Sequence, residues 1–145
     1  GRQLFQRAHV VQPVGQLDQD HADIVHHRQQ HLAQVLRLAL FAATRNAKIG
    51  AVVDCYGVHP NVKLDLAGLE AAVLGVFAER DGFVPAETVR KLEADLRAAA
   101  KRVHCTIYPG VDHAFLNDTR PDVYDANTAA RAWAEIVAFL RAELS

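Results

Sequence analysis

Two side chains in this sequence are of the types that together move protons in enzyme active sites. Asp81 stands in the segment 79–85 (ERDGFVP), and His113 stands in the segment 108–115 (YPGVDHAF). A carboxylate beside a histidine fixes the imidazole tautomer and stabilises the charged ring, so that the other ring nitrogen can accept a nucleophile's proton. Each residue also has a simpler interpretation, because Asp-Gly is common in turns and a loop histidine is often a surface residue. Together, Asp81 and His113 are our candidate catalytic acid and base.

Strand-like runs precede both candidate residues. Short apolar stretches closed by glycine or proline predict strands near 49–56 (IGAVVDCY), 71–77 (AAVLGVF) and 103–108 (VHCTIY). In open parallel sheets, functional groups collect in the loops at the carboxyl ends of the strands. Since Asp81 follows the second strand and His113 the third, we expect their side chains to lie within a few ångströms of each other at that end of the sheet.

Helical patterns separate and flank these strands. Apolar residues recur at spacings of three and four over 86–100 and over 125–144, where Trp133 and Ile136 are expected on the inner face. A further helix is predicted over about 20–44. Strands separated by helices imply parallel pairing and right-handed crossovers. The predicted fold class is therefore α/β, a three-stranded parallel sheet flanked by helices, with an extra N-terminal helix.

The composition of the chain changes near residue 37. All of the glutamines and most of the histidines lie in residues 1–36, whereas Ala, Val, Leu, Glu and Arg dominate the remainder. Such a break indicates a domain boundary, a disordered tail or a junction between unrelated reading frames. We interpret residues 1–37 as an atypical Gln/His-rich segment, a loop and then a helix, of foreign or misframed origin. Because the chain has no methionine and a single serine, Ser145, we expect it to be a fragment.

Four segments in residues 38–145 share their pattern with a known family. They are 53–57 (VDCYG), 74–85 (LGVFAERDGFVP), 107–115 (IYPGVDHAF) and the Tyr124-Asp125 pair that leads into the Trp133 helix. In these segments the chain resembles the dienelactone hydrolase family. The resemblance implies the C-terminal part of an α/β-hydrolase, with Asp81 and His113 in the family's acid and base positions. It also implies hydrolysis of esters or lactones of small carboxylate-bearing molecules by a Cys or Ser nucleophile, without a cofactor.

The nucleophile that this resemblance implies is missing. The family places a cysteine, or in relatives a serine, in a G-x-C-x-G elbow between a strand and a helix. The stretch that should hold this elbow, residues 28–37 (RQQHLAQVLR), contains no Cys, Ser, Thr or Gly. Cys55 and Cys105 lie within predicted strands, where burial raises the pKa of a thiol instead of activating it. We therefore find no nucleophile and expect the chain to be inactive alone.

A rival hypothesis is a non-catalytic chain, either a remnant or a small module that binds a metal or a partner through its histidine-rich helix. His27 and His31 would share a helix face, as would Asp23 and His27, and this geometry can hold Zn²⁺ or Ni²⁺. No flanking motif completes such a ligand set. We therefore assign these side chains to a solvated polar face and predict no metal site.

The charge, the hydropathy and the cysteines of the chain limit the classes of partner and the compartment that we expect. The formal net charge of −1 gives no electrostatic reason to expect nucleic acid or an anionic membrane. No apolar run approaches the roughly 20 residues of a membrane span, and the two cysteines fit a reducing compartment. We therefore predict a cytoplasmic protein with a small-molecule ester or lactone as its partner, no nucleic acid and no membrane. Self-association through the exposed edge of the first strand is also expected.

Overall fold

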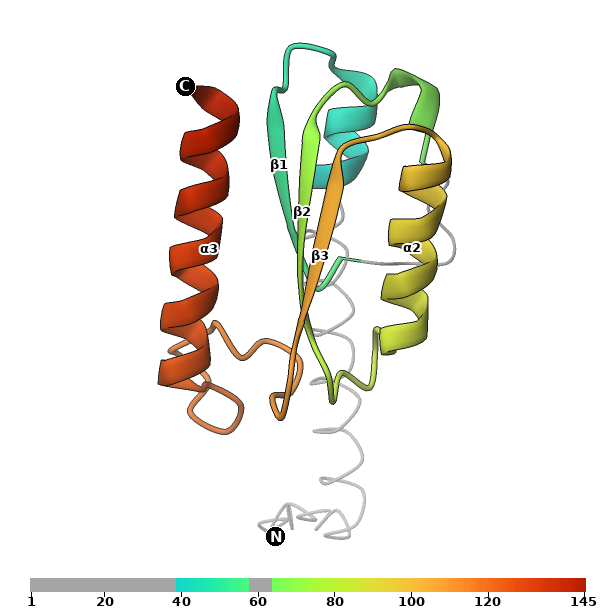
Figure 1. Cartoon of the computed structure of the whole chain (residues 1–145). Coiled ribbons are helices and arrows are strands. Elements are labelled where there is room, and N and C mark those ends of the chain that lie inside the picture. The colour runs from blue at the N-terminus through green and yellow to red at the C-terminus, as the bar shows by residue number, and fades with distance from the viewer. Residues whose placement is uncertain (1–38, 58–63) are drawn as a thin grey trace, which may run out of the picture. The chain divides into compact units, whose positions relative to one another are not determined.

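A parallel sheet forms the centre of the protein. The computed structural model describes residues 39–57 and 64–145. The strands in these ranges are β1 (Ala51–Cys55), β2 (Ala72–Ala78) and β3 (Val103–Tyr108). They pair in the order β1-β2-β3, and both pairings are parallel, as Figure 1 shows.

Helices cover both faces of this sheet. α3 (Ala126–Leu144) lies on one face, and α2 (Ala86–Ala98) lies on the other together with a helix over residues 39–45 (Figure 1). A short 3-10 helix, η1 (Leu66–Gly68), precedes β2. The predicted α/β class, a three-stranded parallel sheet flanked by helices, is confirmed. The extra helix predicted over about 20–44 falls outside the described residues except for 39–44, which belong to the helix over 39–45.

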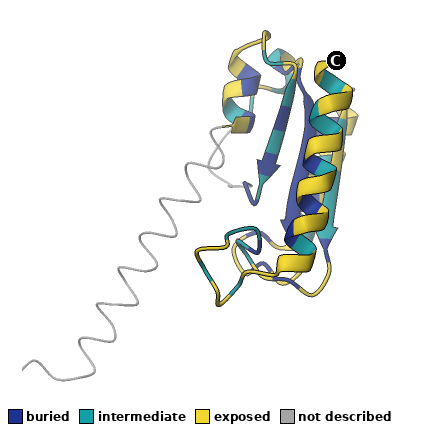
Figure 2. Cartoon of the chain, turned by 90° about the vertical axis from the view of Figure 1, so that its left-hand side faces the viewer, coloured by how far each residue is buried: buried dark blue, intermediate teal, exposed yellow. Residues whose placement is uncertain are grey.

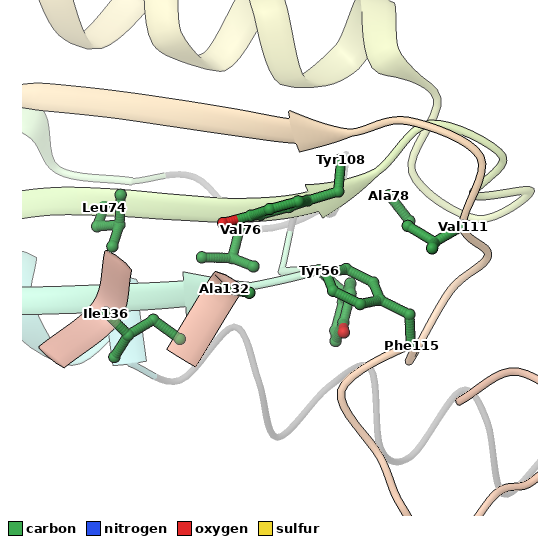
Figure 3. Close-up of a cluster of buried hydrophobic side chains, with 9 residues drawn as sticks. All are labelled: Tyr56, Leu74, Val76, Ala78, Tyr108, Val111, Phe115, Ala132 and Ile136. Atoms are coloured by element: carbon green, nitrogen blue, oxygen red, sulfur yellow. The ribbon is translucent and has the colours of Figure 1, made fainter. Parts of the chain in front are cut away.

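β2 is the central strand and is buried on both faces. All seven of its residues are buried. Because successive side chains of a strand point to opposite faces, Leu74 and Val76 pack in the cluster on the α3 side, which Figure 3 shows. Val73 and Phe77 pack in the clusters on the α2 side. A strand covered on both sides needs a continuous apolar run, which explains why its sequence lacks polar alternation.

The ends of β1 and α2 have local causes that the sequence pattern did not predict. β1 ends at Cys55, one residue short of the predicted strand, because Tyr56 takes a left-handed conformation with φ of 62°. α2 ends at Ala98 because Ala100, with φ of 57°, turns the chain out of the helix. The amide of Lys101 then donates to a carbonyl in the last helical turn, an arrangement typical of helix ends.

α3 presents a narrower apolar face to the sheet than the sequence pattern predicted. Asp125 caps its start by accepting a hydrogen bond from the Thr128 amide at 2.8 Å. The buried residues of this helix are Ala129, Ala132 and Ile136. The expectation that Trp133 faces inward is wrong, since its exposed fraction is 52% and it lies about 100° further around the helix than Ala132. Figure 2 shows this exposed outer face.

None of the helices in the described ranges is long and apolar enough to cross a membrane.

Candidate active site

Asp81 lies in the turn that leaves the carboxyl end of β2. Its Oδ1 accepts hydrogen bonds from the backbone amides of Phe83 at 2.8 Å and Val84 at 2.9 Å. This is the turn chemistry expected of an aspartate before a glycine. The residue is nevertheless buried, with an exposed fraction of 5%. One carboxylate oxygen therefore builds the turn, while Oδ2 remains available to a neighbouring side chain.

His113 lies in the loop after β3, and its ring meets that second oxygen. Nδ1 of His113 and Oδ2 of Asp81 are 2.7 Å apart, a distance typical of a charge-assisted hydrogen bond. The Asp81 side chain is fully covered, and that of His113 keeps 16% of its surface exposed. Because an ionised carboxylate only accepts hydrogen bonds, Nδ1 carries the hydrogen and Nε2 is left as the basic nitrogen. The structure thus brings together the two residues that the sequence predicted to meet.

Two aromatic side chains hold the imidazole ring. The Tyr56 ring lies 5.0 Å from the His113 ring between centroids, and the Phe83 ring lies 5.1 Å away in an edge-on arrangement. Tyr56 is buried, whereas half of the Phe83 surface is exposed. Neither residue was predicted from the sequence, although each stands in a segment that carries the family resemblance. Aromatic residues in loops beside a candidate base are the signal that could have pointed to them.

Polar contacts tie the two site loops to each other. The amide of Gly110 donates to Glu79 Oε2 at 2.8 Å, and the Arg80 guanidinium donates to the carbonyl of Gly110. Arg80 also forms an ion pair with Asp112 at 3.7 Å. These groups are exposed, so each contributes little to the free energy of folding. They fix the β3 loop against the β2 loop from the solvent side, next to the buried Asp81–His113 contact.

No nucleophile accompanies the pair in the part of the chain that the structure describes. Nε2 of His113 has no thiol or hydroxyl hydrogen-bond partner there. Burial is the main cause that raises the pKa of Cys55 to about 12, and the negative charge of Asp54 adds to this rise. Burial is also the main cause that raises the pKa of Cys105 to about 12. Both thiols are therefore protonated near neutral pH, and a protonated thiol is a poor nucleophile. Residues 28–37, where the elbow is expected, lie outside the described ranges.

The metal-binding alternative rests on residues that the structure does not describe. Asp23, His27 and His31 all lie outside the described ranges. Among the residues that are described, no group of three or more His, Cys, Asp or Glu side chains could hold a metal ion.

The fold defines the class of protein. The fold is that of part of an α/β-hydrolase, and the solved structures with a similar fold agree. The structure named "Putative Dienelactone Hydrolase" from Klebsiella pneumoniae matches with a TM-score of 0.64 and 29% identity, over 71% of this chain and 46% of that one. A dienelactone hydrolase-like promiscuous phosphotriesterase from metagenomic libraries matches with a TM-score of 0.62 and 20% identity, over 70% of this chain and 45% of that one.

Sequence comparison identifies the family. The model of the dienelactone hydrolase family matches residues 37–144, so the chain belongs to this family. "Protein usf" of Aquifex pyrophilus is 35% identical over 97 residues, which are 67% of this chain and 42% of that protein. "Putative carboxymethylenebutenolidase" of Aquifex aeolicus is 30% identical over 104 residues, which are 72% of this chain and 45% of that protein. The chain therefore spans less than half the length of these curated relatives.

Proposed function

We propose that Asp81 and His113 are the acid and the base of a Cys/Ser-Asp-His triad that hydrolyses esters or lactones of small carboxylate-bearing molecules. The observation that carries this proposal is the 2.7 Å contact between Asp81 Oδ2 and His113 Nδ1. Two features support it. Asp81 is buried and oriented by the Phe83 and Val84 amides, and the chain belongs to a family of hydrolases.

In the proposed reaction, Nε2 of His113 removes the proton of a cysteine or serine nucleophile as that atom attacks the substrate carbonyl carbon. The imidazolium that results is stabilised by the Asp81 carboxylate. It then returns its proton to the leaving oxygen as the tetrahedral intermediate collapses to an acyl-enzyme. Water hydrolyses the acyl-enzyme with Nε2 again as the base. No step needs a metal or a cofactor.

The nucleophile is the part of this machinery that the chain does not supply. Cys55 and Cys105 are held as protonated thiols, and residues 28–37 contain no candidate side chain. We infer that this chain is a fragment of the catalytic unit and is inactive alone. The elbow, with its backbone amide for the oxyanion, would have to come from the part of the relatives that this chain does not match.

A chimera tests the proposed roles directly. Residues 39–145 would be joined to the part of the Aquifex aeolicus relative that the chain does not match, and hydrolysis of p-nitrophenyl acetate would be measured. We expect saturable turnover that His113→Ala abolishes and that Asp81→Asn lowers by about 10³–10⁴-fold, because the wrong tautomer then faces the nucleophile. His104→Ala is the matched control, since this exposed histidine lies on β3 away from the pair. Turnover that survives His113→Ala would contradict the proposal.

The non-catalytic alternative predicts a different result. If the histidine-rich segment binds a metal, calorimetric titration of the full chain with Ni²⁺ or Zn²⁺ gives stoichiometric heat, and the double variant His27→Ala/His31→Ala loses it. A titration without stoichiometric heat would remove the metal-binding form of this alternative.

A further inference from the structure

The side chain of Tyr56 does not follow the alternation of side chains along β1. In a regular strand Tyr56 would face away from Val53 and Cys55, because alternate residues share a face. Its left-handed φ of 62° breaks this alternation, and the side chain joins the same buried cluster that Val53 and Cys55 contact. The backbone stays in place, since the Tyr56 amide still donates to the carbonyl of Val76 at 3.1 Å. A bulky residue rarely adopts this conformation unless surrounding contacts hold it there.

The aromatic contacts and the hydroxyl hydrogen bond of Tyr56 link it to the His113 loop. Its ring lies 5.0 Å from the His113 ring, with an interplanar angle of 46°, and 5.6 Å from the Phe115 ring in an edge-on arrangement. Its hydroxyl oxygen accepts a hydrogen bond from the backbone amide of Leu116 at 3.0 Å. Figure 3 shows Tyr56 and Phe115 lying together beyond the carboxyl end of β1. The residues on both sides of Ala114 are therefore bound to one tyrosine.

The turn after His113 depends on this hydrogen bond. Ala114 has a left-handed φ of 69°, and the turn makes its own backbone bonds from the Phe115 amide to Asp112 and from the Asn117 amide to Ala114. The Leu116 amide between them donates to the Tyr56 hydroxyl oxygen instead. Leu116 is partly buried, and a partly buried amide that loses its acceptor destabilises the segment that carries it, so loss of this hydroxyl would loosen the turn after His113.

We propose that Tyr56 is a positioning residue for His113, whose ring packs against the imidazole and whose hydroxyl fixes the Leu116 amide, so that Nδ1 stays on Asp81. This inference rests on the proposed function, since it concerns the geometry of the proposed base. Tyr56 does not take part in the proton transfers. Burial raises its pKa well above the ordinary value, which keeps its hydroxyl neutral and in place as an acceptor.

Nitrogen-15 NMR of the histidine rings in the full chain tests this role without any need for catalysis. In the native chain we expect a single His113 tautomer with the hydrogen on Nδ1, and a slowly exchanging Nδ1 proton. Tyr56→Phe keeps the ring and removes only the hydroxyl. We expect this variant to exchange the Nδ1 proton with water about five- to tenfold faster, the loss that one hydrogen bond corresponds to.

Tyr108→Phe is the matched control. Tyr108 is a buried tyrosine of the same cluster, but its hydroxyl donates to Glu135, so its loss should leave the His113 signals unchanged. A folded Tyr56→Phe variant with native His113 signals would overturn the inference. The proposed function is tested separately, by the effect of His113→Ala on the chimera, so either idea can fail without the other. Tyr56→Leu, which removes the ring as well, should mix the two tautomers.

Discussion

At the scale of single residues, the candidate site is built from side chains that each make more than one contact. One carboxylate oxygen of Asp81 accepts hydrogen bonds within its own turn, and the other contacts His113. The ring of Tyr56 packs against His113, and its hydroxyl oxygen accepts a hydrogen bond from the Leu116 amide. Two residues beside the site, Tyr56 and Ala114, adopt left-handed backbone conformations. Such strain persists only where surrounding contacts over-determine it, and it is concentrated in functional sites.

Replacing Ala114 with glycine measures this strain directly. Its φ of 69° lies in the region that glycine adopts without steric penalty. We expect Ala114→Gly to raise the free energy of unfolding by about 0.5–1 kcal/mol, because the relief of roughly 1–2 kcal/mol in the folded state exceeds the added entropy of the unfolded chain. Urea denaturation measures it. Ala98→Gly, at the end of α2, is the control and should lower stability. A destabilised Ala114→Gly protein would show that the Cβ atom makes contacts worth more than the strain.

At the scale of secondary-structure elements, the sequence predicted what local patterns encode. Apolar runs predicted the three strands, and spacings of three and four predicted α2 and α3. The pairing of Asp81 with His113 was predicted because parallel strands end on the same side of a sheet. The hydrogen bond from Leu116 to Tyr56 was not predicted, because it joins residues 60 positions apart and depends on a backbone reversal at Tyr56. Trp133 was misplaced because small alanines, and not the largest apolar residue, face the sheet.

The carboxyl end of β1 also depends on one glycine. A Cβ atom on Gly57 would lie 1.9 Å from Oδ1 of the buried Asp54, so any side chain there must displace the carboxylate or the backbone. We expect Gly57→Ala to lower the free energy of unfolding by about 1–3 kcal/mol, the usual cost of overpacking. Gly82→Ala is the matched control, since nothing lies within 4 Å of the added atom. Equal stability of the two variants in chemical denaturation would contradict the expected clash.

At the scale of the whole molecule, buried ionisable groups set the response to alkaline pH. The pKa of Cys55 rises from its ordinary 9.0 to about 12, and that of Cys105 rises to the same value. Below pH 9 both states keep these protons, so the stability that the two thiols contribute is fully present. Between pH 9 and 12 the unfolded chain loses the protons and the folded chain keeps them, so the free energy of unfolding falls.

This predicts a measurable alkaline transition. Denaturation curves at pH 8 to 11 should show stability decreasing above pH 9, and the double variant Cys55→Ala/Cys105→Ala should show a weaker decrease. Tyr56, whose pKa is also raised by burial, adds to the slope that remains in this variant. A slope unaffected by removal of both thiols would mean that the cysteines ionise alike in the folded and unfolded chains.

The free edge of the sheet leads to a prediction about self-association. In the described ranges no strand pairs with β1 on the side away from β2, and an unpaired strand edge is a template for pairing with another chain. We predict concentration-dependent self-association in light scattering. Ala51→Lys, which places a charge on β1, should reduce it, whereas Ala98→Lys adds the same charge at the exposed end of α2 and should not. A clean monomer at high concentration would contradict this prediction.

The last prediction concerns the activity of the chain alone. A catalytic triad acts as a unit, and a site without its nucleophile keeps only the contribution of binding and the oxyanion hole, roughly 10³–10⁴-fold over water. In the proposed triad the elbow's share of the oxyanion hole would be missing as well, since the sequence contains no G-x-C-x-G motif. We therefore expect the purified chain to hydrolyse p-nitrophenyl acetate no faster than free imidazole at equal histidine concentration. The measurement compares the native chain with His113→Ala and Cys55→Ala. Saturable turnover abolished by His113→Ala would reveal a nucleophile that the sequence does not show. If Cys55→Ala abolished it too, that nucleophile would be Cys55, and the raised pKa of its thiol would be wrong.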